Sequence, residues 1–248
     1  MNCIDKFLRY KPAFTLAEGA THVAKFAKPR RAAFTLAEVL ITLGIIGVVA
    51  AMTMPTLINN AKNKELHSGL MKAYSVMQTV VQNIHVEEGL LLTNIQGTSS
   101  GAYKTKFIKF FNVADDCGTL NCYSRTEGLP RIYKTYTNST INGHYFDDGQ
   151  FLTQDGMFFM IENPSTIAGD YILLSVDVNG PLKNPNRWGF DVFTFEIMSD
   201  GKLMPSGAEG TTFSNTSTYC SKTSTGQYNG IGCTYKALYD KNYWKNLP

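Results

Sequence analysis

The chain has 248 residues, of which 44% are hydrophobic and 17% are charged, with a formal net charge of +3. The charge is distributed unevenly: residues 1–33 carry seven Lys or Arg against two Asp or Glu, whereas residues 34–248 carry 16 against 18. The larger part is therefore slightly acidic, which argues against general nucleic-acid binding, since that requires a basic surface. The residues that follow position 88 are numerous enough for one domain with its own hydrophobic core.

An apolar run follows the basic N-terminal segment. From Phe34 to Met54 the only charged residue is Glu38, and a helix of this length rises about 30 Å, close to the thickness of a bilayer core. Basic residues precede the run at Lys25, Lys28, Arg30 and Arg31. By the positive-inside rule they keep the N-terminus in the cytoplasm and direct the C-terminal part outward. We therefore expect a single-pass protein in which the lone Glu38 is a functional candidate.

The order Phe-Thr-Leu-Ala-Glu at residues 34–38, the long apolar helix behind it and Pro55 resemble the class III signal of type IV pilins and type II secretion pseudopilins. The resemblance implies that a membrane prepilin peptidase cuts between Ala33 and Phe34 and methylates the new N-terminus. Residues 1–33 would then be a leader that is removed. The family usually has Gly before the cut, where this chain has Ala33. Glu38 would be the fifth mature residue, at which the family pairs a carboxylate with the N-terminal amine of a neighbouring subunit.

The resemblance also implies a function, which is assembly of a structural subunit into a helical filament of a type II secretion or type IV pilus machine. Its partners would be identical or related pilin subunits, prepilin peptidase, the inner-membrane assembly platform and membrane lipid. The protein would wait in the bacterial inner membrane and then join a filament in the periplasm or at the cell surface. The alternative is a minor tip pilin whose head binds a surface, a secreted substrate or DNA. A plain membrane anchor explains neither Glu38 nor the order of the residues around it.

The helix is expected to continue beyond the apolar run with a change of character. Gly47 and Pro55 are poor helix formers, so we expect a kink or local melting between them. Apolar residues then recur every three or four positions, which predicts one buried helix face: Leu66, Leu70, Tyr74, Met77, Val81 and Ile84. Gly89 is a plausible C-terminal stop. The prediction is a transmembrane or filament-core helix at 34–57, an amphipathic helix at 58–88 and a head at 89–248.

The head reads as β-rich. Residues 149–162 predict two strands about the Asp155-Gly156 turn, and residues 170–178 and 190–198 are the strongest strand candidates. A turn at Asp200-Gly201 leads into residues 202–204. We expect an α+β fold, in which the long N-terminal helix packs its amphipathic half on a small antiparallel sheet.

Four cysteines remain after residue 33: Cys117, Cys122, Cys220 and Cys233. Three pairings are possible, and proximity in the sequence favours Cys117 with Cys122 and Cys220 with Cys233. Each bond would close a small loop, as in proteins of oxidising compartments. A structural zinc site is the competing interpretation, but no Cys-x-x-Cys spacing supports it.

A metal-binding loop is a second candidate site. Asp177, Asn179 and Asp191 supply oxygen side chains among glycine turns, as a calcium loop requires. These residues equally suit a turn and a strand cap, because Asp and Asn form turns readily. No cofactor is required on either interpretation, and calcium is an optional ligand.

Enzyme signatures give no support to a catalytic function. Residues 97–101 fit Gly-x-Ser-x-Gly, but that motif needs a buried strand before it and a helix after it to expose the nucleophile. The chain has no glycine-rich phosphate loop, no His-Glu-x-x-His and no dinucleotide fingerprint. We therefore do not expect an enzyme.

Overall fold

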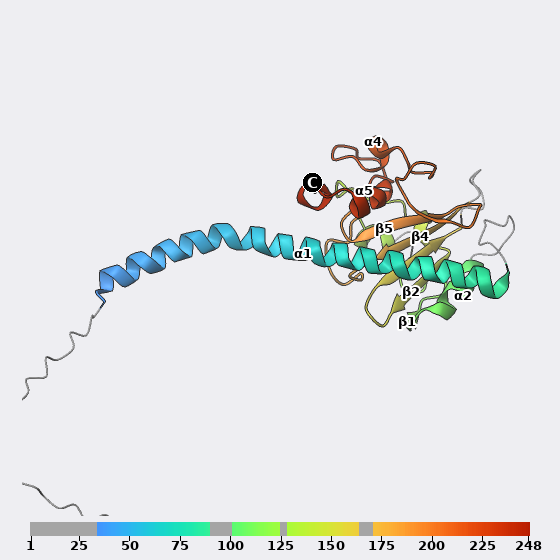
Figure 1. Cartoon of the computed structure of the whole chain (residues 1–248), viewed down its shortest axis with the longest axis horizontal. Helices are drawn as coiled ribbons and strands as arrows, with labels where there is room; N and C mark the ends of the chain where they lie inside the picture. Colours follow the sequence, from blue (N-terminus) through green and yellow to red (C-terminus); the bar gives the residue numbers. More distant parts are fainter. Residues whose placement is uncertain (1–33, 90–100, 125–127, 164–170) are drawn as a thin grey trace, which may run out of the picture. The chain divides into compact units, whose positions relative to one another are not determined.

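The structure is a computed structural model that describes residues 34–89, 101–124, 128–163 and 171–248 (Figure 1). Contacts within the chain divide it between residues 50 and 51. The expected leader with Ala33, and residues 97–100 of the Gly-x-Ser-x-Gly match, lie outside the described residues.

The first element is the helix α1, Leu36–Glu88. It remains α-helical through Pro55, so the local melting expected between Gly47 and Pro55 does not occur. A proline removes one backbone donor, but the hydrogen bonds on either side of that position can continue the helix. The helix ends at Glu88, and the following Gly89 has a φ of +63°, the left-handed conformation common after a helix C-terminus.

From Leu66 onward α1 buries the face that the spacing of its apolar residues predicts. Leu70, Met77 and Ile84 are fully buried and Tyr74 is half-buried. The helix lies across the sheet in Figure 1, and its apolar face joins the same hydrophobic core as the sheet. The 3.6-residue period of the helix and the apolar spacing of the sequence thus agree.

The sheet has six antiparallel strands in the order β1-β2-β3-β4-β5-β6. The strands are β1 (Val113–Asp116), β2 (Gly149–Thr153), β3 (Phe158–Glu162), β4 (Ile172–Asp177), β5 (Val192–Ile197) and β6 (Leu203–Pro205). The β2–β3 hairpin turns at Asp155-Gly156, as predicted, with Gly156 at φ +86°. The α+β fold and the antiparallel meander are therefore confirmed, while β1 was not predicted.

Both faces of the sheet are covered. One face shares a core with α1 and contains Phe195, Leu174 and Phe159. The opposite face buries Phe158, Leu173 and Trp188 with aromatic residues from connecting segments. Strands β4 and β5 are consequently buried at every position, as strands between two layers are.

Short helices complete the head. They are α2 (Ala102–Phe107), η1 (Ile108–Phe110), α3 (Gly128–Ile132), η2 (Gly143–Phe146), α4 (Thr216–Tyr219), η3 (Ile231–Cys233), α5 (Thr234–Tyr239) and η4 (Tyr243–Lys245). Disulfides join Cys117 to Cys122 and Cys220 to Cys233. These are the pairs that sequence proximity favours.

Candidate functional site

The N-terminal part of α1 presents its apolar side chains without cover. Phe34 is 82% exposed, Ile46 is 63% exposed and Ile58 is 63% exposed. This helix is long and apolar enough to cross a membrane: an 18-residue window reaches a mean hydropathy of 2.2, and none of that window is buried. A continuous apolar surface of this kind marks a contact with lipid or with protein.

The charge at the start of this segment is held by a capping box. Thr35 donates to Glu38 Oε2 from its backbone nitrogen and from its hydroxyl, both at 2.8 Å, and Glu38 N donates to Thr35 Oγ1 at 3.3 Å. Thr-x-x-Glu is the sequence pattern of such a box, because the two side chains satisfy backbone N–H groups that lack a helical partner. Thr35 is thus a site residue that was not predicted, although the pattern was readable at residues 35–38.

The expected site residues of α1 are otherwise spread along the helix. Pro55 lies inside the helix. Gly44 and Gly47 face open space, with no heavy atom of the chain within 4 Å of where a side chain would begin. Small residues on an exposed apolar helix allow another helix to approach closely. The start of α1 therefore carries an exposed carboxylate and a surface suited to helix packing.

The structure brings the three residues of the candidate calcium loop together. Asp177 and Asp191 are fully buried. Asp177 accepts from Gly180 N at 2.9 Å and from the Tyr133 hydroxyl at 2.9 Å. Asp191 accepts hydrogen bonds from the backbone nitrogen of Asn186 at 2.8 Å and from that of Arg187 at 2.7 Å. Burial raises the pKa of Asp177 to about 8, with the charge of Asp191 adding to the shift, and burial raises the pKa of Asp191 to about 6.

The side-chain amide of Asn179 lies between these carboxylates. In the orientation that satisfies all three groups, its nitrogen donates to Asp177 Oδ1 at 2.8 Å and to Asp191 Oδ2 at 3.2 Å. With the amide turned over, three side-chain oxygens would converge at this place, which is a donor set that calcium accepts. A calcium ion held by Asp177, Asn179 and Asp191 in that orientation would neutralise the buried carboxylates and cross-link the loop. The calcium site stays a prediction.

A further acidic cluster was not predicted. The carboxylates of Asp147, Asp148 and Glu162 have oxygen atoms within 4.8 Å of one another. Burial, with the nearby Asp147 and Asp148, raises the pKa of Glu162 to about 10. The first two residues precede β2 and the third ends β3, so the hairpin pairing brings them together. No sequence pattern indicates this proximity.

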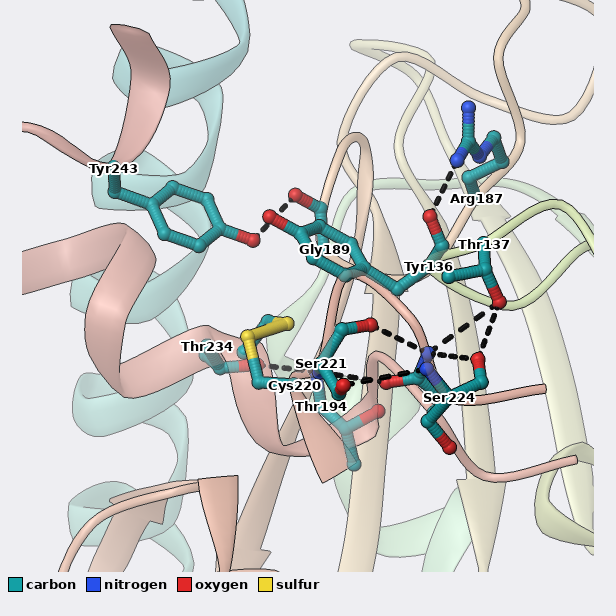
Figure 2. Close-up of a disulfide and its surroundings, with 12 residues drawn as sticks. Tyr136, Thr137, Arg187, Gly189, Thr194, Cys220, Ser221, Ser224, Thr234 and Tyr243 are labelled. Carbon is teal, nitrogen blue, oxygen red and sulfur yellow. Dashed lines mark hydrogen bonds between the residues drawn. A yellow bond between two sulfur atoms is a disulfide. The ribbon is translucent and has the colours of Figure 1, made fainter. Parts of the chain in front are cut away.

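The disulfide between Cys220 and Cys233 lies in a network that ties the C-terminal segment to the sheet (Figure 2). Thr194 N of β5 donates to Thr234 Oγ1 at 2.9 Å. The Tyr243 hydroxyl donates to Gly189 O at 2.7 Å. The last helical segments are thereby fixed to β5 and to the loop before it.

Residues 28–54 match a family model, the prokaryotic N-terminal methylation motif. This motif is the signature of the prepilin-type signal of type IV pilins and pseudopilins. No curated protein and no solved structure matches the chain. The motif and the long apolar helix α1 fit a single-pass, membrane-anchored protein. Pilins are structural, non-enzymatic proteins.

Proposed function

We propose that this protein, with the N-terminal methylation motif at residues 28–54, is a structural subunit, a pilin or pseudopilin. Prepilin peptidase removes residues 1–33 and methylates Phe34, and the mature chain assembles into a helical filament of a type II secretion or type IV pilus machine. The observation that carries the proposal is the exposed apolar face of α1 behind a capped Glu38, within the matched motif.

Before cleavage, the basic leader sets the orientation in the membrane. Its lysines and arginines precede the apolar run, so the N-terminus stays in the cytoplasm and the head is outside. Cleavage removes that charge and leaves the amine of Phe34 at the start of the helix. The single-pass subunit then waits in the inner membrane for the assembly platform.

Assembly uses the charge at Glu38. Both hydrogen bonds from Thr35 end on Glu38 Oε2, so Oε1 can accept the Phe34 ammonium of an adjacent subunit. Among packed apolar helices the pair is desolvated, so a carboxylate without its amine is strongly disfavoured. Electrostatic complementarity of this kind sets register and partner choice. Gly44 and Gly47 leave room for the neighbouring helices to pack.

Three variants distinguish the effect of the Glu38 charge from the effect of the capping box formed by Thr35 and Glu38. Glu38→Ala and Glu38→Gln both remove the charge, while Thr35→Ala removes the cap and keeps the charge. We expect all three to insert into the membrane, and we expect both Glu38 variants to lose filament incorporation, because truncating one partner of a desolvated pair costs about 2–5 kcal/mol. Thr35→Ala loses only about 1 kcal/mol of helix stability.

The measurement is the amount of each variant in membranes and in sheared or purified filaments. Normal incorporation of Glu38→Ala would overturn the charge-pairing mechanism. Failure of Thr35→Ala to assemble, with Glu38→Gln normal, would show that the carboxylate acts only as a cap.

A further inference from the structure

We propose that the head binds the outer surface of an anionic phospholipid membrane through a basic rim beside α1. The rim consists of Lys62, Lys64, Leu182, Lys183, Lys241 and Lys245, with Trp244 among them. The inference rests on the proposed function for the placement of α1 in a membrane, and it adds a second membrane contact, made by the head.

The first part of the rim lies on α1 just beyond the apolar run. Leu57 and Ile58 are 71% and 63% exposed, and Lys62 and Lys64 follow as exposed residues. At about 1.5 Å per residue, the two lysines lie roughly 6–9 Å beyond Ile58 along the helix. The polar headgroup layer is of comparable thickness, so these ammonium groups fall at the level of lipid phosphates.

The loop between β4 and β5 supplies the second part. Leu182 is 93% exposed and precedes the exposed Lys183. Lys62 Nζ donates to Asn184 O at 2.7 Å, which ties this loop to α1. A hollow between the loop and the helix is lined by Ile58, Lys62 and Lys183, among others. An apolar tip beside lysines is suited to a lipid surface, where the leucine leaves water and the lysines reach the headgroups.

The C-terminal segment supplies the third part. Asn63 Nδ2 donates to Trp244 O at 2.7 Å, and the Trp244 and His67 rings lie 5.6 Å apart. These contacts bring Lys241 and Lys245 next to Lys64, around a hollow of about 400 Å³. The segment is held in place by the bond from Tyr243 to the chain before β5 (Figure 2). The N–H of the part-buried Trp244 donates to Ala237 O at 2.9 Å, and tryptophan rings are enriched at membrane interfaces.

Charge favours an anionic membrane over a second copy of the chain. The two hollows are lined by five lysines against two carboxylates, Glu65 and Asp240, whereas residues 34–248 as a whole are slightly acidic. The same face of another copy would carry the same charge and repel it. Near an anionic leaflet each lysine strengthens binding by about fivefold. Once residues 1–33 are removed, the Lys62 and Lys64 pair supplies the lysines nearest to the apolar run.

The test uses the full mature chain, residues 34–248, in lipid nanodiscs. The discs contain either phosphatidylcholine alone or a mixture with phosphatidylglycerol, and each carries a headgroup spin label that quenches nearby tryptophan fluorescence. The chain has two tryptophans, and Trp188 is buried in the core at 1% exposed. The quenched signal therefore reports Trp244, and Trp244→Phe is the control that must abolish it.

We expect quenching to be stronger in the phosphatidylglycerol discs and to fall at high salt. Lys241→Gln with Lys245→Gln should weaken the docked state by about thirtyfold, since each lysine contributes about fivefold. The matched control removes two exposed lysines elsewhere on the head, Lys202→Gln with Lys222→Gln, and should keep the quenching. Leu182→Ser should reduce it without changing charge.

Equal quenching in both lipids, or equal loss in both lysine pairs, would overturn the proposal. A signal that depends on the number of chains per disc rather than on the lipid would assign the rim to contacts between copies, and would also overturn it. Resistance of the chain to alkaline extraction is measured in parallel. A chain that fails to insert contradicts the proposed function, whereas a chain that inserts without lipid-dependent quenching contradicts this inference alone.

Discussion

The beginning of α1 and the head differ in how far their apolar side chains are exposed. Between Leu36 and Ile58 the large apolar side chains are exposed, whereas the strands of the head bury theirs almost completely. The head has partners for its apolar residues within the chain. The large apolar side chains of the helix segment are exposed instead, and such a surface suits contact with lipid or with other subunits. The head thus has its own hydrophobic core, whereas the beginning of α1 has an exposed apolar surface.

The sharpest test of this comparison is a matched pair of truncations. Leu174→Ala removes a fully buried side chain of β4, and Ile45→Ala removes one that is 60% exposed. We expect Leu174→Ala to lower the free energy of unfolding of the head by about 2–5 kcal/mol, because it leaves a cavity. Ile45→Ala should change it by less than about 0.5 kcal/mol. Chemical denaturation in detergent measures both effects. A large loss of head stability in Ile45→Ala would contradict the distinction between an exposed helix segment and a buried head core.

Removal of each disulfide tests how much that bond contributes to the stability of the head. Replacing Cys220 and Cys233 with Ser opens a loop with a sequence separation of 13, and replacing Cys117 and Cys122 opens one with a separation of 5. By loop-closure entropy we expect losses of about 3 and about 2 kcal/mol in the free energy of unfolding. Denaturation of the two double variants measures these losses, and membrane insertion should be unaffected in both.

The buried carboxylates give a pH-dependent effect. Asp177 has its pKa raised by burial from about 3.8 to about 8. A carboxyl group with a raised pKa contributes most stability below its unfolded value, and that contribution falls as the pH rises through the folded value. We expect Asp177→Asn, which cannot ionise, to lose stability less steeply than the unmodified protein between about pH 4 and pH 8. Asp200→Asn is the control, since hydrogen bonds from Lys202 lower the pKa of Asp200 instead of raising it.

The effect of calcium on the melting temperature distinguishes between the two orientations of the Asn179 side-chain amide. With the amide nitrogen bridging Asp177 and Asp191, a calcium chelator should leave the melting temperature unchanged. Asn179→Asp replaces that nitrogen with a third carboxylate oxygen, so its melting temperature should rise on addition of calcium. A melting temperature of the unmodified protein that rises with calcium would instead confirm the calcium site.

Local patterns predicted the parts of the fold in which neighbouring residues decide the structure. The four-and-three spacing from Leu66 to Ile84 indicated the buried helix face, and Asp155-Gly156 indicated the β2–β3 turn. Strand β1 was missed because it is short, contains two aspartates and pairs with a strand more than thirty positions away. Pairing at such distances leaves no periodic signal.

The second layer of the head was missed for the same reason. Tyr133, Phe146 and Trp188 come from connecting segments without a regular spacing, yet they fill the far side of the sheet. At the candidate site, Glu38 was predicted from its order in the motif, and Thr35 follows from the capping pattern. The place of Asn179 between two carboxylates depends on the folded loop and could not be read from spacing.

In the proposed function, the exposed helix becomes the N-terminus of an assembled subunit. Mass spectrometry of the protein purified from its native membrane tests it directly. We expect an N-terminal peptide that begins at Phe34 and carries one additional methyl group on its amine. A protein that retains residues 1–33 in the membrane, or that begins at another residue, would contradict it.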